Sequence, residues 1–195
     1  MQARHLMLKT AIALGVLGTV LSGCTTTGNQ PATQASTESR RQSIDASVDG
    51  TLSRLYQTTP GARELVAKAR GVLVFPSVVQ AGVVIGGEHG DGALRVGGAT
   101  AGYYSLSSAS VGAQLGVQSK AVVYLFMTQE ALDKFRNSNG WSAGGDASVA
   151  VVKMGANGQI DTTTTTKPVE VFVLTNSGLM GDLSVSSTKI THLDL

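Results

Sequence analysis

The stretch that decides the fold of this chain is GVLVFPSVVQAGVVIGGEHGDGALRVGGATAGYYSLSSASVGAQLGVQ, residues 71–118. Its apolar residues recur at every second position, most clearly at Val111, Ala113, Leu115 and Val117. That period places alternate side chains on opposite faces of a pleated strand. Glycine inside a strand weakens pairing unless a bulge, a bend or a close backbone approach requires it. We expect a strongly curved antiparallel sheet whose glycines let it bend and let the two preceding helices approach its backbone.

The N-terminus has the pattern of a secretory signal. Arg4 and Lys9 precede an apolar run, residues 10–20, that is too short to span a bilayer and ends in Leu-Ser-Gly-Cys. This ending resembles the lipobox of bacterial lipoproteins, in which Cys24 is acylated and becomes the new N-terminus. A buried cysteine after a transmembrane anchor is the alternative. We expect residues 1–23 to be a signal peptide and Cys24, the only cysteine, to be the lipidation site.

The resemblance also implies where the protein resides. Thr25 follows the cysteine where inner-membrane retention would require Asp, which resembles the outer-membrane sorting pattern. We therefore expect a protein of the bacterial cell envelope, lipid-anchored in the outer membrane and facing the periplasm.

The charge and cysteine content limit the possible partners. Cleavage would remove two of the 15 basic residues and leave 13 against 13 acidic residues. A neutral chain argues against nucleic acid as a partner, because neutralising phosphates requires a basic stripe or patch. One cysteine allows no disulfide framework, but a domain of this size buries enough surface to fold without one. The chain therefore reads as one globular domain on a lipid tether.

The segment before the sheet predicts a tether and two helices. Residues 24–42 are polar and lack aromatic residues, a composition typical of a flexible tether, and the folded domain is expected over 43–195. Apolar residues from Ile44 to Tyr56 share one helical face, although Gly50 weakens that helix by about 1 kcal/mol. Thr59 and Pro60 predict the N-cap and first turn of a second helix, which Gly71 ends.

The remainder of the chain alternates strands and turns around one helix. The apolar run of residues 121–127 predicts a central strand covered on both faces. Thr128 is expected to cap a short amphipathic helix over Gln129–Arg136. Residues 137–145 read as a loop, and further strands are predicted at 148–154, 159–166, 169–175 and 183–193, with a hairpin turn at Asn157-Gly158. The fold class is α+β, with a barrel-like or sandwich sheet, two N-terminal helices and one interior helix.

Three patterns in the sequence contain residue types found in catalytic or cofactor sites. Glu88, His89 and Asp91 are residue types that bind metals or transfer protons, but Gly-Gly-Glu-His-Gly-Asp-Gly reads better as a turn between strands. Ser186 and Lys189 match a Ser-x-x-Lys spacing without the motifs that accompany it. The glycines of residues 86–92 lack the helix and the Lys of a phosphate-binding loop. We therefore expect no enzyme activity, no metal and no cofactor.

Two features suggest contact with a membrane. Residues 40–70 hold six basic residues against three acidic ones, and each basic residue near an anionic membrane contributes about 1 kcal/mol. The alternative is the solvated face of a core helix. Trp141, in a glycine-rich loop, suits either a membrane interface or a plug at the end of the sheet.

Several segments together resemble the SYLF domain family. They are residues 71–77, 82–88, 96–98, 102–106, 123–127, 135–136, 140–141, 145–149 and 174–179, and the resemblance runs from about Ser43 to Leu195. Eukaryotic members bind membrane lipids, phosphoinositides especially, through a basic amphipathic N-terminal segment, and a yeast branch binds actin. Bacterial members resemble secreted lipoproteins with a lipid-binding role. The resemblance implies that residues 40–70 contact lipid, with head-group candidates Arg54, Arg63, Lys68 and Arg70.

These observations favour a non-enzymatic lipoprotein that binds anionic phospholipid through its SYLF-like domain. The alternative is a structural or protein-interaction lipoprotein of the envelope, which docks a protein partner on a sheet edge or the Trp141 loop.

Overall fold

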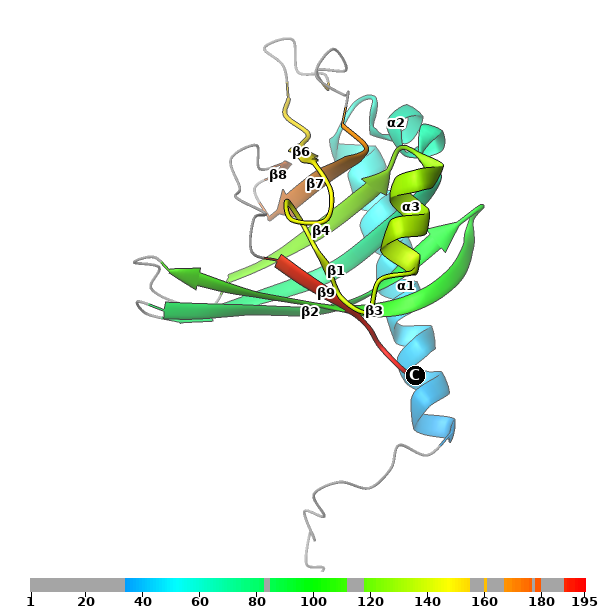
Figure 1. Ribbon diagram of the computed structural model, residues 1–195, viewed down its shortest axis with the longest axis vertical. Helices are drawn as coiled ribbons and strands as arrows, with labels where there is room; N and C mark the ends of the chain where they lie inside the picture. Colours follow the sequence, from blue (N-terminus) through cyan, green and yellow to red (C-terminus); the bar gives the residue numbers. More distant parts are fainter. Residues whose placement is uncertain are drawn as a thin grey trace, which may run out of the picture. The chain divides into compact units, whose positions relative to one another are not determined.

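The computed structural model describes residues 34–82, 85–111, 118–154, 160, 167–176, 178–179 and 188–195. They lie within one compact unit, residues 32–195, of the α+β class that the sequence predicts (Figure 1). The helices are α1 (Gln34–Thr58), α2 (Ala62–Lys68) and α3 (Gln129–Arg136). The strands are β1 (Gly71–Gly82), β2 (Ile85–Val96), β3 (Ala99–Val111), β4 (Gln118–Phe126), β5 (Trp141–Ser142), β6 (Val149–Val151), β7 (Val169–Thr175), β8 (Gly178–Leu179) and β9 (Thr188–His192).

The described strands form one strongly curved sheet. Their order is β5-β9-β3-β2-β1-β4-β7-β6, and β8 pairs with β7. The predicted central strand is confirmed, since β4 lies between β1 and β7 and its last six residues are buried. The predicted antiparallel pairing is confirmed for the described strands except β6 and β7, which pair in parallel. Residues 152–168 connect them, and that length suffices for a parallel connection, which takes a dozen residues or more.

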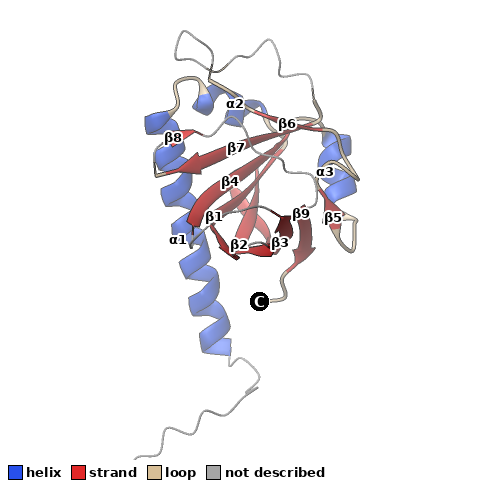
Figure 2. Cartoon of the chain, turned by 90° about the vertical axis from the view of Figure 1, so that its left-hand side faces the viewer, coloured by secondary structure: helices blue, strands red, loops and turns tan. Residues whose placement is uncertain are grey.

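Helices cover the two faces of the sheet separately. Figure 2 shows α1 on one side of the sheet and α3 on the other. The face under α1 and α2 has an aliphatic core that includes Val48, Leu55, Leu65, Val74 and Leu125. The face under α3 has a core rich in aromatic rings, including Phe75, Tyr124, Phe126, Phe135 and Trp141. Burial on both faces explains why residues 121–126 are continuously apolar rather than alternating.

The first helix is longer than its sequence predicts. It begins at Gln34, inside the segment expected to be a flexible tether, and it passes through Gly50 without a break. Its residues 34–43 are mostly exposed, which agrees with their polar composition. Its buried positions start at Ile44 and recur at Val48, Thr51 and Leu55, so packing on the sheet outweighs the low helix propensity of one glycine.

The predicted start of the second helix is wrong. Its N-cap is Gly61, which has a positive φ of 85°, and Thr59 stays outside the helix with its side chain buried. The carbonyl of Thr59 accepts a hydrogen bond from Ala62, which closes a turn between α1 and α2. The helix also ends before Gly71, which begins β1. By contrast, the predicted cap of α3 is confirmed, because Ala131 N donates to Thr128 Oγ1 over 3.2 Å.

The segment Gly-Gly-Glu-His-Gly-Asp-Gly is strand rather than the predicted turn. It lies inside β2, and the turn to β3 is formed instead by Gly97 and Gly98, with φ of 59° and 85°. At Gly92 a Cβ atom would lie 2.1 Å from the carbonyl oxygen of Val74, beside a register shift between Val74 and Val79. The expected bulge and close backbone approach are therefore present. The approaching backbone belongs to β1, however, and not to the two N-terminal helices.

Candidate functional site

Four cations remain free of carboxylates on the outer surface of α1 and α2. Arg54 lies on α1, Arg63 and Lys68 lie on α2, and Arg70 follows α2 directly. All four are exposed, and none forms an ion pair within the described residues. The guanidinium carbon of Arg63 lies 4.3 Å from the ring centroid of Tyr56, a cation–π contact that leaves the charge open to solvent. Of the predicted lipid-contacting residues, these four are exposed, whereas Trp141 is buried.

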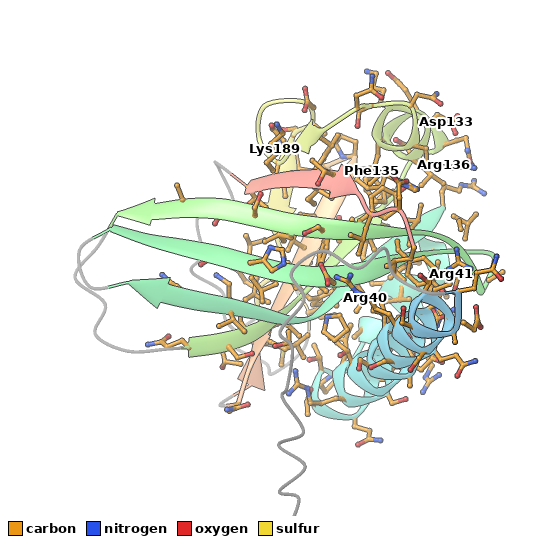
Figure 3. The ribbon with its side chains drawn as sticks, turned by 90° about the horizontal axis from the view of Figure 1, so that it is seen from below. Arg40, Arg41, Asp133, Phe135, Arg136 and Lys189 are labelled. Carbon is orange, nitrogen blue, oxygen red and sulfur yellow. The ribbon has the colours of Figure 1, made fainter. Side chains whose placement is uncertain are left out.

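The other two arginines of the basic segment hold α1 in place. Arg40 Nη2 lies 2.7 Å from Asp91 Oδ2 on β2, and Arg41 donates to the backbone carbonyl of Leu195 at the C-terminus. Both arginines lie in the N-terminal half of α1 (Figure 3). The six basic residues therefore separate into two that contact the fold and four that face solvent.

Asp45 fixes α1 to the β2–β3 hairpin. It accepts hydrogen bonds from Tyr103 Oη at 2.8 Å and from Thr100 Oγ1 at 2.9 Å, and it lies 3.3 Å from Arg95 Nη2. Burial, followed by the hydrogen bond to Asp45, raises the pKa of Tyr103 to about 12. The guanidinium of Arg95 also lies 2.8 Å from Asp49 Oδ1. Both aspartates of α1 are thus paired with Arg95 and do not neutralise the four free cations.

A groove of about 280 Å³ runs between α1, the end of α2 and the β2–β3 turn. Its apolar lining is contributed by Leu52, Tyr56, Val66, Ala69 and Val72. All but Val72 are only partly buried. Arg70 lines the groove, and Arg63 stacks on the ring of Tyr56, one of the lining residues. The groove thus joins an apolar surface to one free cation, and a second contacts a residue of its wall. No sequence pattern revealed it, because its walls come together only through the packing of α1 and α2 on the sheet.

Trp141 is part of the core. It is 1% exposed and lies in β5, which pairs with β9, so the expected loop over residues 137–145 contains a short strand. Its ring meets Tyr124, Phe126 and Phe135 at centroid distances of 5.9, 6.1 and 5.7 Å. Figure 3 shows Phe135 turned toward the sheet while Asp133 and Arg136 point away from it. Of the two alternatives for Trp141, the structure supports the plug at the sheet and not insertion into a membrane.

The acidic residues of β2 divide between its two faces, as the period of a strand requires. His89 and Asp91 lie on the α1 face, with His89 Nε2 3.7 Å from Asp91 Oδ1. Glu88 lies on the other face, where it accepts from Lys120 Nζ at 2.7 Å and from Ser108 Oγ at 3.2 Å. Sequence reasoning missed this ion pair, since it depends on the register of three strands. In the part of the chain described, no three His, Cys, Asp or Glu side chains converge as metal ligands.

A second buried acid also escaped the sequence analysis. Glu170 on β7 is 1% exposed, and neither carboxylate oxygen has a hydrogen-bond partner. Burial raises the pKa of Glu170 above the usual range. Cys24, the predicted lipidation site, and Ser186, of the Ser-x-x-Lys spacing, lie outside the described residues. Among the described helices, none has the length and apolar character needed to cross a membrane.

The comparison with protein families supports the resemblance seen in the sequence. Residues 107–194 match the family described as Ysc84: Las17-binding protein actin regulator. The match begins within β3 and extends through β9, so the four free cations precede it. No curated protein matches the chain. A domain of this family is a lipid-binding or protein-interaction domain. Residues 107–194, less than half of the chain, are thus similar to the Ysc84 family, also called the SYLF family.

Proposed function

We propose that this chain is a non-enzymatic lipoprotein of the bacterial cell envelope whose SYLF domain binds anionic phospholipid. Acylated Cys24 anchors the protein in the outer membrane, and the domain faces the periplasm. Arg54, Arg63, Lys68 and Arg70 contact the phospholipid head groups. The observation that carries the proposal is the exposure of these four cations without a carboxylate partner.

The position of the unpaired cations on α1 and α2 supports an electrostatic mode of binding. Within α1 the cations near the N-terminus are used to hold the helix, while those near its C-terminus and on α2 face solvent. Ile44, Val48 and Leu55 of α1 are buried against the sheet, and Leu52 and Tyr56 keep only part of their surface open. Binding of this kind draws on head-group attraction, which weakens as salt shortens the Debye length from about 10 Å at 0.1 M.

Vesicle flotation tests the proposal. The protein is residues 24–195 with Cys24→Ser, mixed with phosphatidylglycerol-containing vesicles at low salt. Replacing the four cations by glutamine removes about 1 kcal/mol each and lowers the affinity by roughly three orders of magnitude. A matched control replaces four other exposed cations, Arg136, Lys153, Lys167 and Lys189, and so makes the same change in net charge. Equal losses in the two variants, or no flotation of the unaltered protein, would overturn the proposal.

A protein-interaction role is the second candidate. It is favoured by the family description, which names a Las17-binding protein and an actin regulator. A stoichiometric protein partner recovered from envelope extract, together with no flotation of the unaltered protein, would favour this role over lipid binding.

A further inference from the structure

The groove between α1, α2 and the β2–β3 turn has two chemically different parts. Its floor is apolar, with Leu52, Val66 and Val72 facing the space between the two helices and the sheet. Leu52 and Val66 keep part of their surface open to solvent although they also contact the core beneath them. Apolar surface of this kind gains roughly 25 cal/mol for each Å² that a ligand covers.

The charged part of the groove favours an anion. Arg70 lines the groove without a carboxylate partner, and Arg63 lies over the ring of Tyr56, which is one of the lining residues. The one acidic residue that lines it, Asp49, lies 2.8 Å from Arg95 Nη2 and is already paired. One free cation therefore lines the groove and a second contacts its wall, beside an apolar floor.

The size of the groove limits what it holds. Its volume of about 280 Å³ lies at the lower edge of the ~300–1,000 Å³ found for small-molecule sites. A whole phospholipid therefore does not fit, but the first part of one acyl chain does. At the β2–β3 end the groove stays open, since a Cβ atom on Gly97 or Gly98 would meet nothing within 4 Å.

We propose that this groove binds a single anionic phospholipid molecule, with its head group at Arg63 and Arg70 and the first part of one acyl chain on the apolar floor. The inference rests on the proposed lipid-binding function and adds to it a discrete site. A surface that attracts head groups through charge alone would use all four cations alike. A groove that holds one lipid uses Arg70, which lines it, and Arg63, which contacts its Tyr56, more than it uses Arg54 and Lys68.

The experiment uses dihexanoyl-phosphatidylglycerol at concentrations where it is monomeric, added to residues 24–195 with Cys24→Ser. Isothermal titration calorimetry is expected to show saturable binding of one lipid per protein, and methyl NMR signals of Leu52 and Val66 are expected to shift. Replacing Arg63 and Arg70 together by glutamine is expected to weaken binding about tenfold or more, which is ~1.4 kcal/mol. A control pair of exposed cations outside the N-terminal helices, Lys153→Gln and Lys167→Gln, makes the same charge change and is expected to leave binding within about twofold.

A second pair of variants tests the apolar floor. Ala67 is exposed and lines the groove, so Ala67→Trp is expected to fill it and to abolish binding. Ala46→Trp adds the same side chain to an exposed position of α1 that does not line the groove, and it is expected to bind normally. Circular dichroism shows whether each variant is folded. If Ala67→Trp does not fold, the Arg63 and Arg70 double variant and the methyl NMR shifts test the lipid site instead.

Several results would overturn the proposal that the groove binds one phospholipid. They are the absence of saturable binding, equal losses in the two charge pairs, equal binding by the two tryptophan variants, and binding of glycerol phosphate as tight as that of the lipid. The experiments distinguish failure of this proposal from failure of the proposed function. If only the lipid site in the groove is wrong, the protein still floats with anionic vesicles; if the proposed function is wrong, it does not.

Discussion

Replacing Gly92 by alanine tests why the central sheet needs glycine. The added Cβ would lie 2.1 Å from the carbonyl oxygen of Val74 and 2.7 Å from Phe75 Cδ1. Unstrained contacts between carbon atoms are about 3.5–4.0 Å. The two strands would have to separate by more than about 1 Å beside the register shift in β1, at the expense of their hydrogen bonds.

The expected cost is large because the obstacle is backbone. Val74 and Phe75 are both fully buried, at 0% exposure, so neither can move into solvent. Overpacking in a core costs about 1–3 kcal/mol and sometimes more, and here we expect at least ~3 kcal/mol. That is a substantial part of the ~5–15 kcal/mol by which a domain is usually stable. Gly87 is the matched control, since its nearest atom would be 3.9 Å from the new Cβ, and Gly87→Ala should change stability by no more than about 1 kcal/mol.

Urea unfolding followed by tryptophan fluorescence measures both variants. Trp141 is the only tryptophan of the chain and is buried among aromatic rings, so its emission reports loss of the core. We expect a clear drop in the urea midpoint for Gly92→Ala and almost none for Gly87→Ala. A Gly92→Ala protein within about 1 kcal/mol of the unaltered one would refute the close approach of β1 to β2.

Three further changes probe polar groups that hold or strain the fold. Asp45→Ala is expected to cost about 1.5–3 kcal/mol in chemical unfolding and to lower the pKa of Tyr103 from about 12 in an ultraviolet titration; an unchanged titration would contradict the hydrogen bond. Glu170→Leu is expected to stabilise the protein by about 1–3 kcal/mol at neutral pH, because it removes a buried acid without a partner. Because burial raises the folded pKa of Glu170, its contribution to the free energy of unfolding is complete below the unfolded pKa of about 4.3 and is lost as the pH rises through the folded pKa. Urea midpoints measured at several pH values should therefore show this loss for the unaltered protein and not for Glu170→Leu. Lys120→Met leaves Glu88 unpaired at 11% exposure and is expected to cost about 3 kcal/mol, most of which a second change, Glu88→Leu, should restore; a double variant as unstable as the single one would contradict the pairing.

Features that depend on neighbouring residues could be predicted from the sequence. The unbroken apolar run of residues 121–126 identified β4 as a strand buried on both faces, because each of its side chains must meet apolar surface. Thr128 identified the start of α3, because an N-cap acts within one helical turn. The spacing from Ile44 to Leu55 likewise identified the buried face of α1.

Features that depend on a distant strand could not be predicted from the sequence. The glycines of β2 resembled a turn because turns also favour glycine, and only the bulge in β1 reveals that Gly92 makes room for another backbone. The ion pair of Glu88 with Lys120 depends on the register of β1 against both β2 and β4, which period-two alternation does not specify. The groove depends on where α2 packs, and no local pattern encodes that position.

The basic segment shows how pairing with distant residues changes the meaning of a charge count. From the sequence alone, residues 40–70 carry six basic and three acidic residues, a modest excess. In the folded domain Asp45 and Asp49 are paired with Arg95, which lies outside the segment, while Arg40 is paired with Asp91. Within the described residues, Glu64 is then the one carboxylate of the segment without an ion pair beside the exposed cations Arg54, Arg63, Lys68 and Arg70. Four free cations less Glu64 leave the same net excess of three positive charges as the whole segment, six less three, so pairing does not raise the charge of the segment. It leaves that charge on the C-terminal half of α1, on α2 and at Arg70, where it supports the proposed binding of an anionic membrane.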